Sequence, residues 1–235
     1  MVKRGTRLSR KITVTEVRLL QAIQAHFCAL NGIVNTPQTA FARLIGEAQE
    51  CNEALANDDL KEVKGELADL VIFSLTVANT YAIDFDAEIM QMAQTLPGVD
   101  AMADQTEGPV ANTLNITTLQ DAQRQYNQLE GNPPTAQEAY QKMVETTGEV
   151  QRAIEKHDIR RVSRGLVGIV LCVMDIANHY QIDLAGAITD KFTRNYIKYN
   201  PAKSKALLES GMTEAEMLET HRSQWNRSDD GNYIK

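Results

Sequence analysis

The sequence predicts an all-α protein: a helical bundle made of two related units in a pseudo-two-fold arrangement. Long segments repeat apolar residues with the 3.6-residue period of a helix, and glycine and proline are sparse within them. No segment alternates polar and apolar side chains as a half-buried strand would. Of the 235 residues, 43% are hydrophobic, so the chain is able to bury a sizeable core.

Three amphipathic segments account for most of the first half. The first places Val17, Leu20 and Phe27 on one side, and the second turns Phe41 and Leu44 inward. The third contains the run LADLVIFSLTVA and is the most apolar of the three. We expect three helices here, at residues 15–31, 38–57 and 60–82.

The second half repeats this plan at a constant offset. The dipeptide Ile83-Asp84 recurs as Ile182-Asp183, 99 positions later (183 − 84), and the same offset pairs Glu50 with Glu149 without a gap. A constant offset across three helices indicates duplication and fusion of one unit. Since a unit of about three helices is too small for a good core, we expect the two to pack together and imitate a homodimer.

The offset and the glycine and proline content predict the domain boundaries. Pro97, Gly98, Gly108 and Pro109 interrupt the helical pattern between the two halves, and the chain turns polar after Asn200. We expect a first unit at 1–94, a linker at 95–113, a second unit at 114–200 and a polar C-terminal tail at 201–235.

Composition excludes several classes of function. The net charge of −7 argues against a nucleic-acid partner, and no stretch is long and apolar enough for a membrane span. The three cysteines form no CxxC pair, which predicts a reducing, cytoplasmic location. The four histidines lack HxxxH and ExxH spacing, which argues against zinc and di-iron sites. The basic N-terminus is open to two interpretations, a frayed arm or a transit peptide.

Four carboxylates form the most informative pattern of the chain. Glu47 and Glu50 lie in GEAQE, and Glu66 and Asp69 lie in GELAD; each pair is spaced i, i+3 and therefore lies on one face of its helix. Two such helices packed antiparallel would aim all four groups at one point, as a hard divalent cation requires. Asp69 begins an apolar run, where a carboxylate is costly unless it is paired, protonated or bound to metal. A solvated helical face is the competing interpretation of Glu47 and Glu50.

The repeat is asymmetric in its chemistry. At the offset of 99, three of the four acids have lost their carboxylate, and the residues there are Thr146, Gly165 and Gly168. The second unit instead ends in KFTRNYIKYN, where Lys191 and Asn195 are i, i+4 neighbours flanking Arg194. This pattern predicts one composite site, with acids from the first unit and phosphate-binding groups from the second.

These residues resemble the all-α nucleoside triphosphate pyrophosphohydrolases of the MazG-like superfamily, which includes MazG, the dimeric dUTPases and the dCTP pyrophosphatases. The signature of that group is ExxE, a spacer and ExxD, and its members often carry a later lysine with an asparagine four residues on. Lys191 and Asn195 fit this last feature. The chain departs from the pattern at Gly46, where a second glutamate is common, and at Gln49, where glycine is usual.

The resemblance implies a Mg²⁺-dependent hydrolase, with Mn²⁺ as the other ion that would fit, that converts a nucleoside triphosphate to its monophosphate and pyrophosphate. It implies that Glu47, Glu50, Glu66 and Asp69 are catalytic metal ligands. It also implies that Lys191 and Asn195 bind the phosphates of the substrate. Arg194 is a further candidate for phosphate binding, with an ordinary basic residue near a helix C-terminus as the alternative, and Gln21 is a candidate for contacting the base. The protein would act as a monomeric pseudo-dimer or as a homodimer. A non-catalytic nucleotide sensor or adaptor, and a purely structural bundle, are the alternatives.

Overall fold

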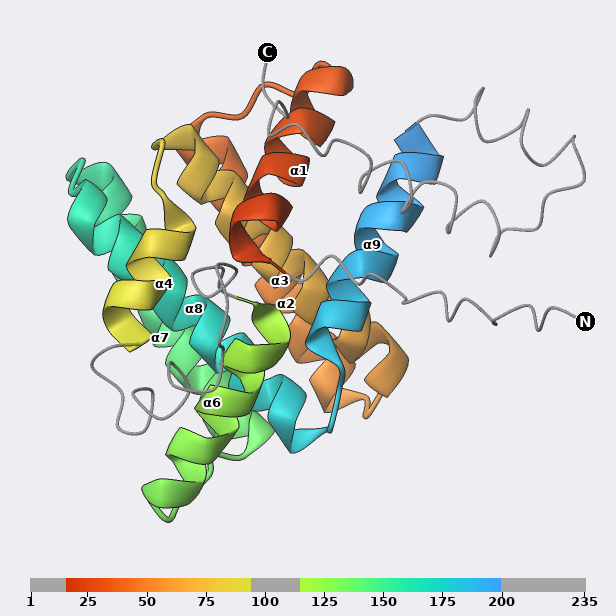
Figure 1. Ribbon diagram of the computed structural model, residues 1–235, viewed down its shortest axis with the longest axis vertical. Coiled ribbons are helices and arrows are strands. Elements are labelled where there is room, and N and C mark those ends of the chain that lie inside the picture. The colour runs from red at the N-terminus through yellow and green to blue at the C-terminus, as the bar shows by residue number, and fades with distance from the viewer. Residues whose placement is uncertain (1–15, 94–114, 200–235) are drawn as a thin grey trace, which may run out of the picture.

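The computed structural model describes residues 16–93 and 115–199, and this part of the chain is all-α, as predicted (Figure 1). No strand forms among these residues; a lone bridge joins Glu16 to Asn115. The helices are α1 (Val17–Leu30), α2 (Pro37–Ala56), α3 (Leu60–Thr80), α4 (Phe85–Ala93), α6 (Ile116–Leu129), α7 (Ala136–Glu155), α8 (Ile159–His179) and α9 (Leu184–Tyr199).

The three helices predicted in the first half are confirmed, each to within two residues at either end. Local chemistry explains where they begin. Thr36 and Thr39 form a reciprocal capping box at the start of α2, and Pro37 occupies its first turn. Asp59 caps α3 by accepting hydrogen bonds from the backbone N–H groups of Lys61 and Glu62.

Two helical hairpins form the centre of the molecule. The hairpin of α2 and α3 packs against the hairpin of α7 and α8, while α1 lies on α3 and α6 lies on α8 (Figure 1). The last helix of each half crosses over: α9 packs on α3, and α4 packs on α8. As a result, side chains from the end of the second half reach the buried helix of the first half.

Corresponding helices of the two halves start 99 residues apart, for example α2 and α7 (136 − 37) and α3 and α8 (159 − 60). The same offset relates the positive-φ residues Asp58 (53°) and His157 (54°), which end the turns before α3 and α8. Duplication and a pseudo-two-fold arrangement stay predictions. The predicted linker at 95–113 and the predicted tail at 201–235 lie outside the described residues.

The hydrophobic core is continuous across the two hairpins. Cys51 and Cys172 are buried and Cys28 is half-buried, and all three are free thiols, as the sequence predicted. No single helix of the described residues is long and apolar enough to cross a membrane. Two consecutive pairs, α3 with α4 and α8 with α9, reach that length only together and are bent by 112° and 109°.

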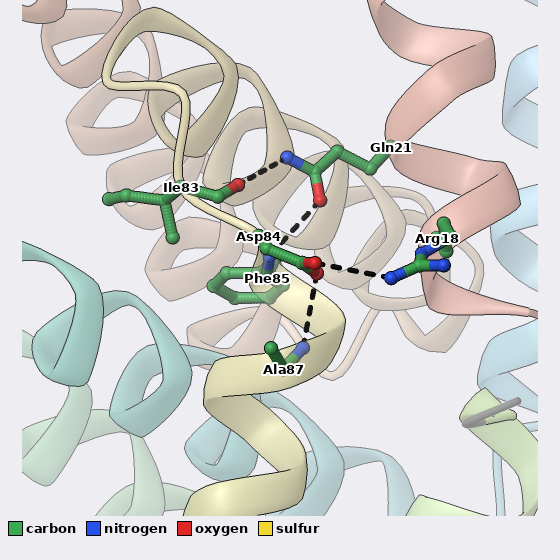
Figure 2. Close-up of polar contacts among 6 residues, drawn as sticks. All are labelled: Arg18, Gln21, Ile83, Asp84, Phe85 and Ala87. Carbon is green, nitrogen blue, oxygen red and sulfur yellow. Dashed lines mark hydrogen bonds and ion pairs between the residues drawn. The ribbon is translucent and has the colours of Figure 1, made fainter. Parts of the chain in front are cut away.

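Gln21 ties α1 to the turn between α3 and α4 (Figure 2). Its Nε2 donates to the carbonyl oxygen of Ile83 (2.7 Å) and to Oδ1 of Asn79 (3.0 Å), and its Oε1 accepts from the N–H of Phe85 (3.2 Å). Gln120 makes the corresponding bonds to Ile182 and Leu184 in the second half. One amide therefore satisfies backbone groups that the change of chain direction leaves without helical partners.

Replacing Gln21 by alanine should lower the free energy of unfolding by about 1–3 kcal/mol, because it leaves partly buried backbone groups unpaired. Gln120→Ala should cost a similar amount. Arg18→Ala is the matched control, since it removes only the exposed Arg18–Asp84 ion pair at the same turn and should cost less than about 1 kcal/mol. Urea unfolding followed by circular dichroism measures all three; equal losses for Gln21→Ala and Arg18→Ala would contradict this account.

Candidate metal centre

Three carboxylates from α2 and α3 converge at the α2–α3 interface. Glu47 lies in α2, and Glu66 and Asp69 lie in α3; one oxygen atom from each lies within 4.8 Å of the others. Glu66 and Asp69 are only 7% and 5% exposed, and Glu47 is half-buried. The short turn between the helices makes them antiparallel neighbours, so the i, i+3 spacing brings the acids to one place.

Burial raises the pKa of all three acids, and neighbouring charged groups modify each shift. Burial is the main cause for Glu47, and the negative charges of Asp69, Glu66 and Glu50 add to it, raising its pKa to about 8. Burial also raises the pKa of Glu66 and of Asp69, with further increases from neighbouring carboxylates. With a pKa of about 8, Glu47 therefore retains its proton at neutral pH when no metal ion is bound. A strongly perturbed set of carboxylates is typical of a functional site rather than of a solvated helical face.

The cluster suits a hard divalent cation. Oε2 of Glu66 is buried and accepts no hydrogen bond from any described residue, which is costly unless an ion or water satisfies it. Carboxylate oxygens are the ligands preferred by Mg²⁺ and similar ions. The sequence predicted that all four acids converge, and the structure brings three of them, Glu47, Glu66 and Asp69, together.

Glu50 lies beside the cluster rather than within it. Its charge contributes to the raised pKa values of Glu47, Glu66 and Asp69, so it is close enough to act on a bound ion. Its side chain is exposed and lines an open groove of about 570 Å³, to which Glu66 also contributes. Hereafter this hollow is called the acid groove; its charged lining residues are Glu50, Glu53, Asp59, Glu62 and Glu66.

Lys191 comes from the second half and pairs with Asp69. Its Nζ forms an ion pair with Oδ2 of Asp69, because α9 crosses over to pack on α3. Burial alone would lower the pKa of Lys191, but Asp69, Glu66 and Glu47 outweigh that effect and raise it. The sequence predicted that acids of the first half and a lysine of the second half lie together, and the Lys191–Asp69 ion pair is such a contact.

The other residues predicted to bind substrate, Asn195, Arg194 and Gln21, lie at different places relative to the acid cluster. Asn195 lies one helical turn beyond Lys191 and is half-buried, whereas Arg194 is exposed on the same helix. Gln21 is held at the far end of α3, roughly 15 Å along the helix from Asp69 at 1.5 Å per residue. Its amide is used by the turn, which does not favour the predicted role in substrate binding.

Two residues at the end of α9, Lys198 and Tyr199, also make interactions near the site. Lys198 is close enough to Asp69 to lower its pKa. Tyr199, beside it, packs edge-to-face on Phe27 of α1 with ring centroids 5.3 Å apart. These contacts hold the last turn of α9 against α1. The KFTRNYIKYN segment indicated the lysine, but not this aromatic contact.

The corresponding place in the second half is filled by apolar atoms. Gly165 and Gly168 stand at the positions of Glu66 and Asp69. A Cβ atom at Gly165 would lie 2.3 Å from Cγ2 of Val150, and one at Gly168 would lie 3.3 Å from Cγ2 of Thr146. Methyl groups therefore occupy the space that the carboxylates use in the first half.

The described helices hold two buried carboxylates and one half-buried carboxylate together, and a lysine pairs with one of them. These features define a class of helical proteins suited to binding a metal ion together with a phosphate-bearing ligand. Residues 35–97 match the family described as the MazG nucleotide pyrophosphohydrolase domain, and these residues include all four acids predicted from the sequence. Members of that family are divalent-metal-dependent nucleoside triphosphate pyrophosphohydrolases, which are hydrolases acting on phosphoric anhydrides. No curated protein and no solved structure matches the chain significantly.

The metal-free protein should lose stability as the pH rises from about 5 to 8. Glu47 has a pKa of about 8 when folded and 4.5 as a model value, so the folded state binds more protons than the unfolded state in this window. Thermal unfolding in EDTA across this range measures the slope, and saturating Mg²⁺ should raise the midpoint most at pH 8.

Glu47→Gln should flatten that slope, because glutamine has no proton to lose. Glu149→Gln is the matched control, since it changes a carboxylate at the position equivalent to Glu50, away from the acid cluster. A slope in Glu47→Gln as steep as in the parent protein would show that the cluster does not hold the proton.

Proposed function

We propose that this protein is a Mg²⁺-dependent pyrophosphohydrolase that converts a (d)NTP and water to the (d)NMP and pyrophosphate. The observation that carries the proposal is the convergence of Glu47, Glu66 and Asp69 on one point, beside Lys191. The MazG match at 35–97 includes all of the acids and supports nucleotide pyrophosphohydrolase activity. Adjustment of the cellular nucleotide pool is the biological role we infer.

Glu47, Glu66 and Asp69 would hold the metal ion, with Glu50 at its open side. A bound divalent cation supplies Lewis acidity to phosphate oxygens and lowers the pKa of a nearby water molecule. Glu50 is exposed on the groove side of the cluster, where water has access. That position suits the removal of a proton from the attacking water, because a general base must face solvent and the reacting atoms.

Lys191 would bind the phosphate chain. In the metal-free protein its ammonium group pairs with Asp69 and partly compensates the buried negative charge. With metal and nucleotide present, the same group would face the phosphate oxygens, where a fixed cation stabilises charge that develops during cleavage. Asn195, on the same side of α9 four residues on, would orient the phosphates by hydrogen bonding.

Asp69→Asn and Glu47→Gln should each reduce turnover at least about 100-fold, because each removes charge from the metal site. Purified protein is incubated with Mg²⁺ and each of the common (d)NTPs, and release of monophosphate and pyrophosphate is measured. Activity on dUTP or dCTP alone would define a dUTPase-like or dCTPase-like enzyme, and activity on all of them a broad MazG-like one.

Glu149→Gln is the control for this assay, and it should retain nearly full activity. It lies in the half where methyl groups fill the carboxylate positions. If no nucleotide is hydrolysed by the unmodified protein with Mg²⁺ or Mn²⁺, the enzymatic proposal fails. Full activity in both acid-site variants would show that chemistry occurs elsewhere.

Lys191→Met should lower kcat/KM by about 100-fold, because it removes a fixed cation from the phosphates. Methionine is the residue at the equivalent position of the first half, Met92. The same change should tighten Mg²⁺ binding in the absence of nucleotide, since no lysine then competes for Asp69. Lys191→Arg should recover part of the activity. Weaker metal binding in Lys191→Met would show that Lys191 organises the acids instead of competing with the ion.

A further inference from the structure

The second half contains a hollow that corresponds in position to the acid groove but has the opposite charge. This basic pocket, of about 480 Å³, is lined by residues of α7, of α8 and of the turn between them. Its charged lining residues are Arg152, Lys156, Arg161, Arg164, Glu149 and Asp158. Four cations and two carboxylates therefore share one hollow in a chain whose net charge is −7.

The difference in charge between the acid groove and the basic pocket arises at lining positions that correspond at the offset of 99. At the offset of 99, Arg152 stands where the acid groove has Glu53, and Arg161 stands where it has Glu62. Lys156 replaces Asn57 at another lining position. The hollow between the two helices is thus present in both halves, while its lining has changed from one that attracts cations to one that attracts anions.

Most of the four cations have no carboxylate partner. Arg161 pairs with Asp158 at 3.3 Å, but none of the ion pairs among the described residues includes Arg152, Lys156 or Arg164. Like charges gathered in a hollow repel one another and raise the local concentration of anions. An anion bound between them would relieve that repulsion.

The chemistry of the lining identifies the class of anion. Arginine presents a planar fork that matches two phosphate oxygens, and three arginines around one hollow favour a ligand with several phosphate groups. The volume lies within the range of small-molecule pockets, about 300–1,000 Å³. Gly165 in the lining and the methyl groups behind it leave no carboxylate cluster to hold a metal ion.

We infer that the basic pocket between α7 and α8 is a binding site for a polyphosphate anion, separate from the acid cluster and independent of a metal ion. Two sources share this chemistry: free pyrophosphate and the phosphate chain of a nucleoside triphosphate. The proposal does not depend on catalysis at the acid cluster, because the residues that carry it lie in the other hairpin.

Calorimetric titration of the full chain in EDTA tests the inference without any turnover. Pyrophosphate and a non-hydrolysable nucleoside triphosphate are titrated separately into the parent protein and into Arg152→Gln/Arg164→Gln. The double change should weaken binding at least about tenfold, the loss expected from one or two charged hydrogen bonds. The ligand bound more tightly by the parent protein identifies the source.

Two further variants locate the site. Arg160→Gln removes an exposed arginine from the same turn of α8 that does not line the pocket, and Lys191→Met removes the cation at the acid cluster. Both should bind pyrophosphate within about twofold of the parent protein, far less than the tenfold change that one hydrogen-bonded charge produces. Equal weakening in Arg160→Gln would show diffuse charge attraction, and loss in Lys191→Met would place the anion at the acid cluster.

Two other results would also overturn the inference. One is absence of binding to the parent protein, and the other is tighter binding of a short DNA duplex than of either small ligand. Circular dichroism and thermal unfolding check that each variant is folded, which we expect because all of the changed arginines are exposed. Stabilisation of the parent protein by pyrophosphate, absent in the double variant, gives a second readout that needs no heat of binding.

Discussion

The ion pair between Lys191 and Asp69 is the contact on which the site depends. Asp69 is buried among apolar residues of α3, with two other carboxylates close by, and such a group is costly unless a cation compensates it. The first half has no equivalent lysine, because Met92 occupies that position. The compensating charge is supplied by α9, and the crossing of the last helices is what brings it there.

The two halves differ strongly in chemistry, although the first three helices of each half start and end 99 residues apart. The scaffold needs capped helices, short turns and the amides of Gln21 and Gln120, and both halves retain them. The carboxylates are not among those requirements, since Gly165 and Gly168 replace two of them in an equally long helix. The acids of the first half therefore call for an explanation beyond folding, and metal binding is the one we propose.

Much of the fold could be predicted from the sequence, because the helical period and the capping residues are local signals. The convergence of Glu47, Glu66 and Asp69 also followed from i, i+3 spacing once their helices were taken as antiparallel neighbours. The role of Gln21 could not be predicted, because its bonds to Ile83 and Phe85 depend on where a distant turn lies in space. The positive charge of the basic pocket could not be predicted either. Its arginines come from two helices, and each one alone has the pattern of a solvated surface residue.

The packing of Val150 against Gly165 has a consequence for how this chain can change. A glutamate restored at position 165 would collide with the valine, and a smaller residue at position 150 alone would leave a cavity beside a glycine. Each of these two single changes is therefore destabilising. The tight contact between these two side-chain positions therefore keeps the second hairpin from acquiring an acid cluster by one substitution at a time.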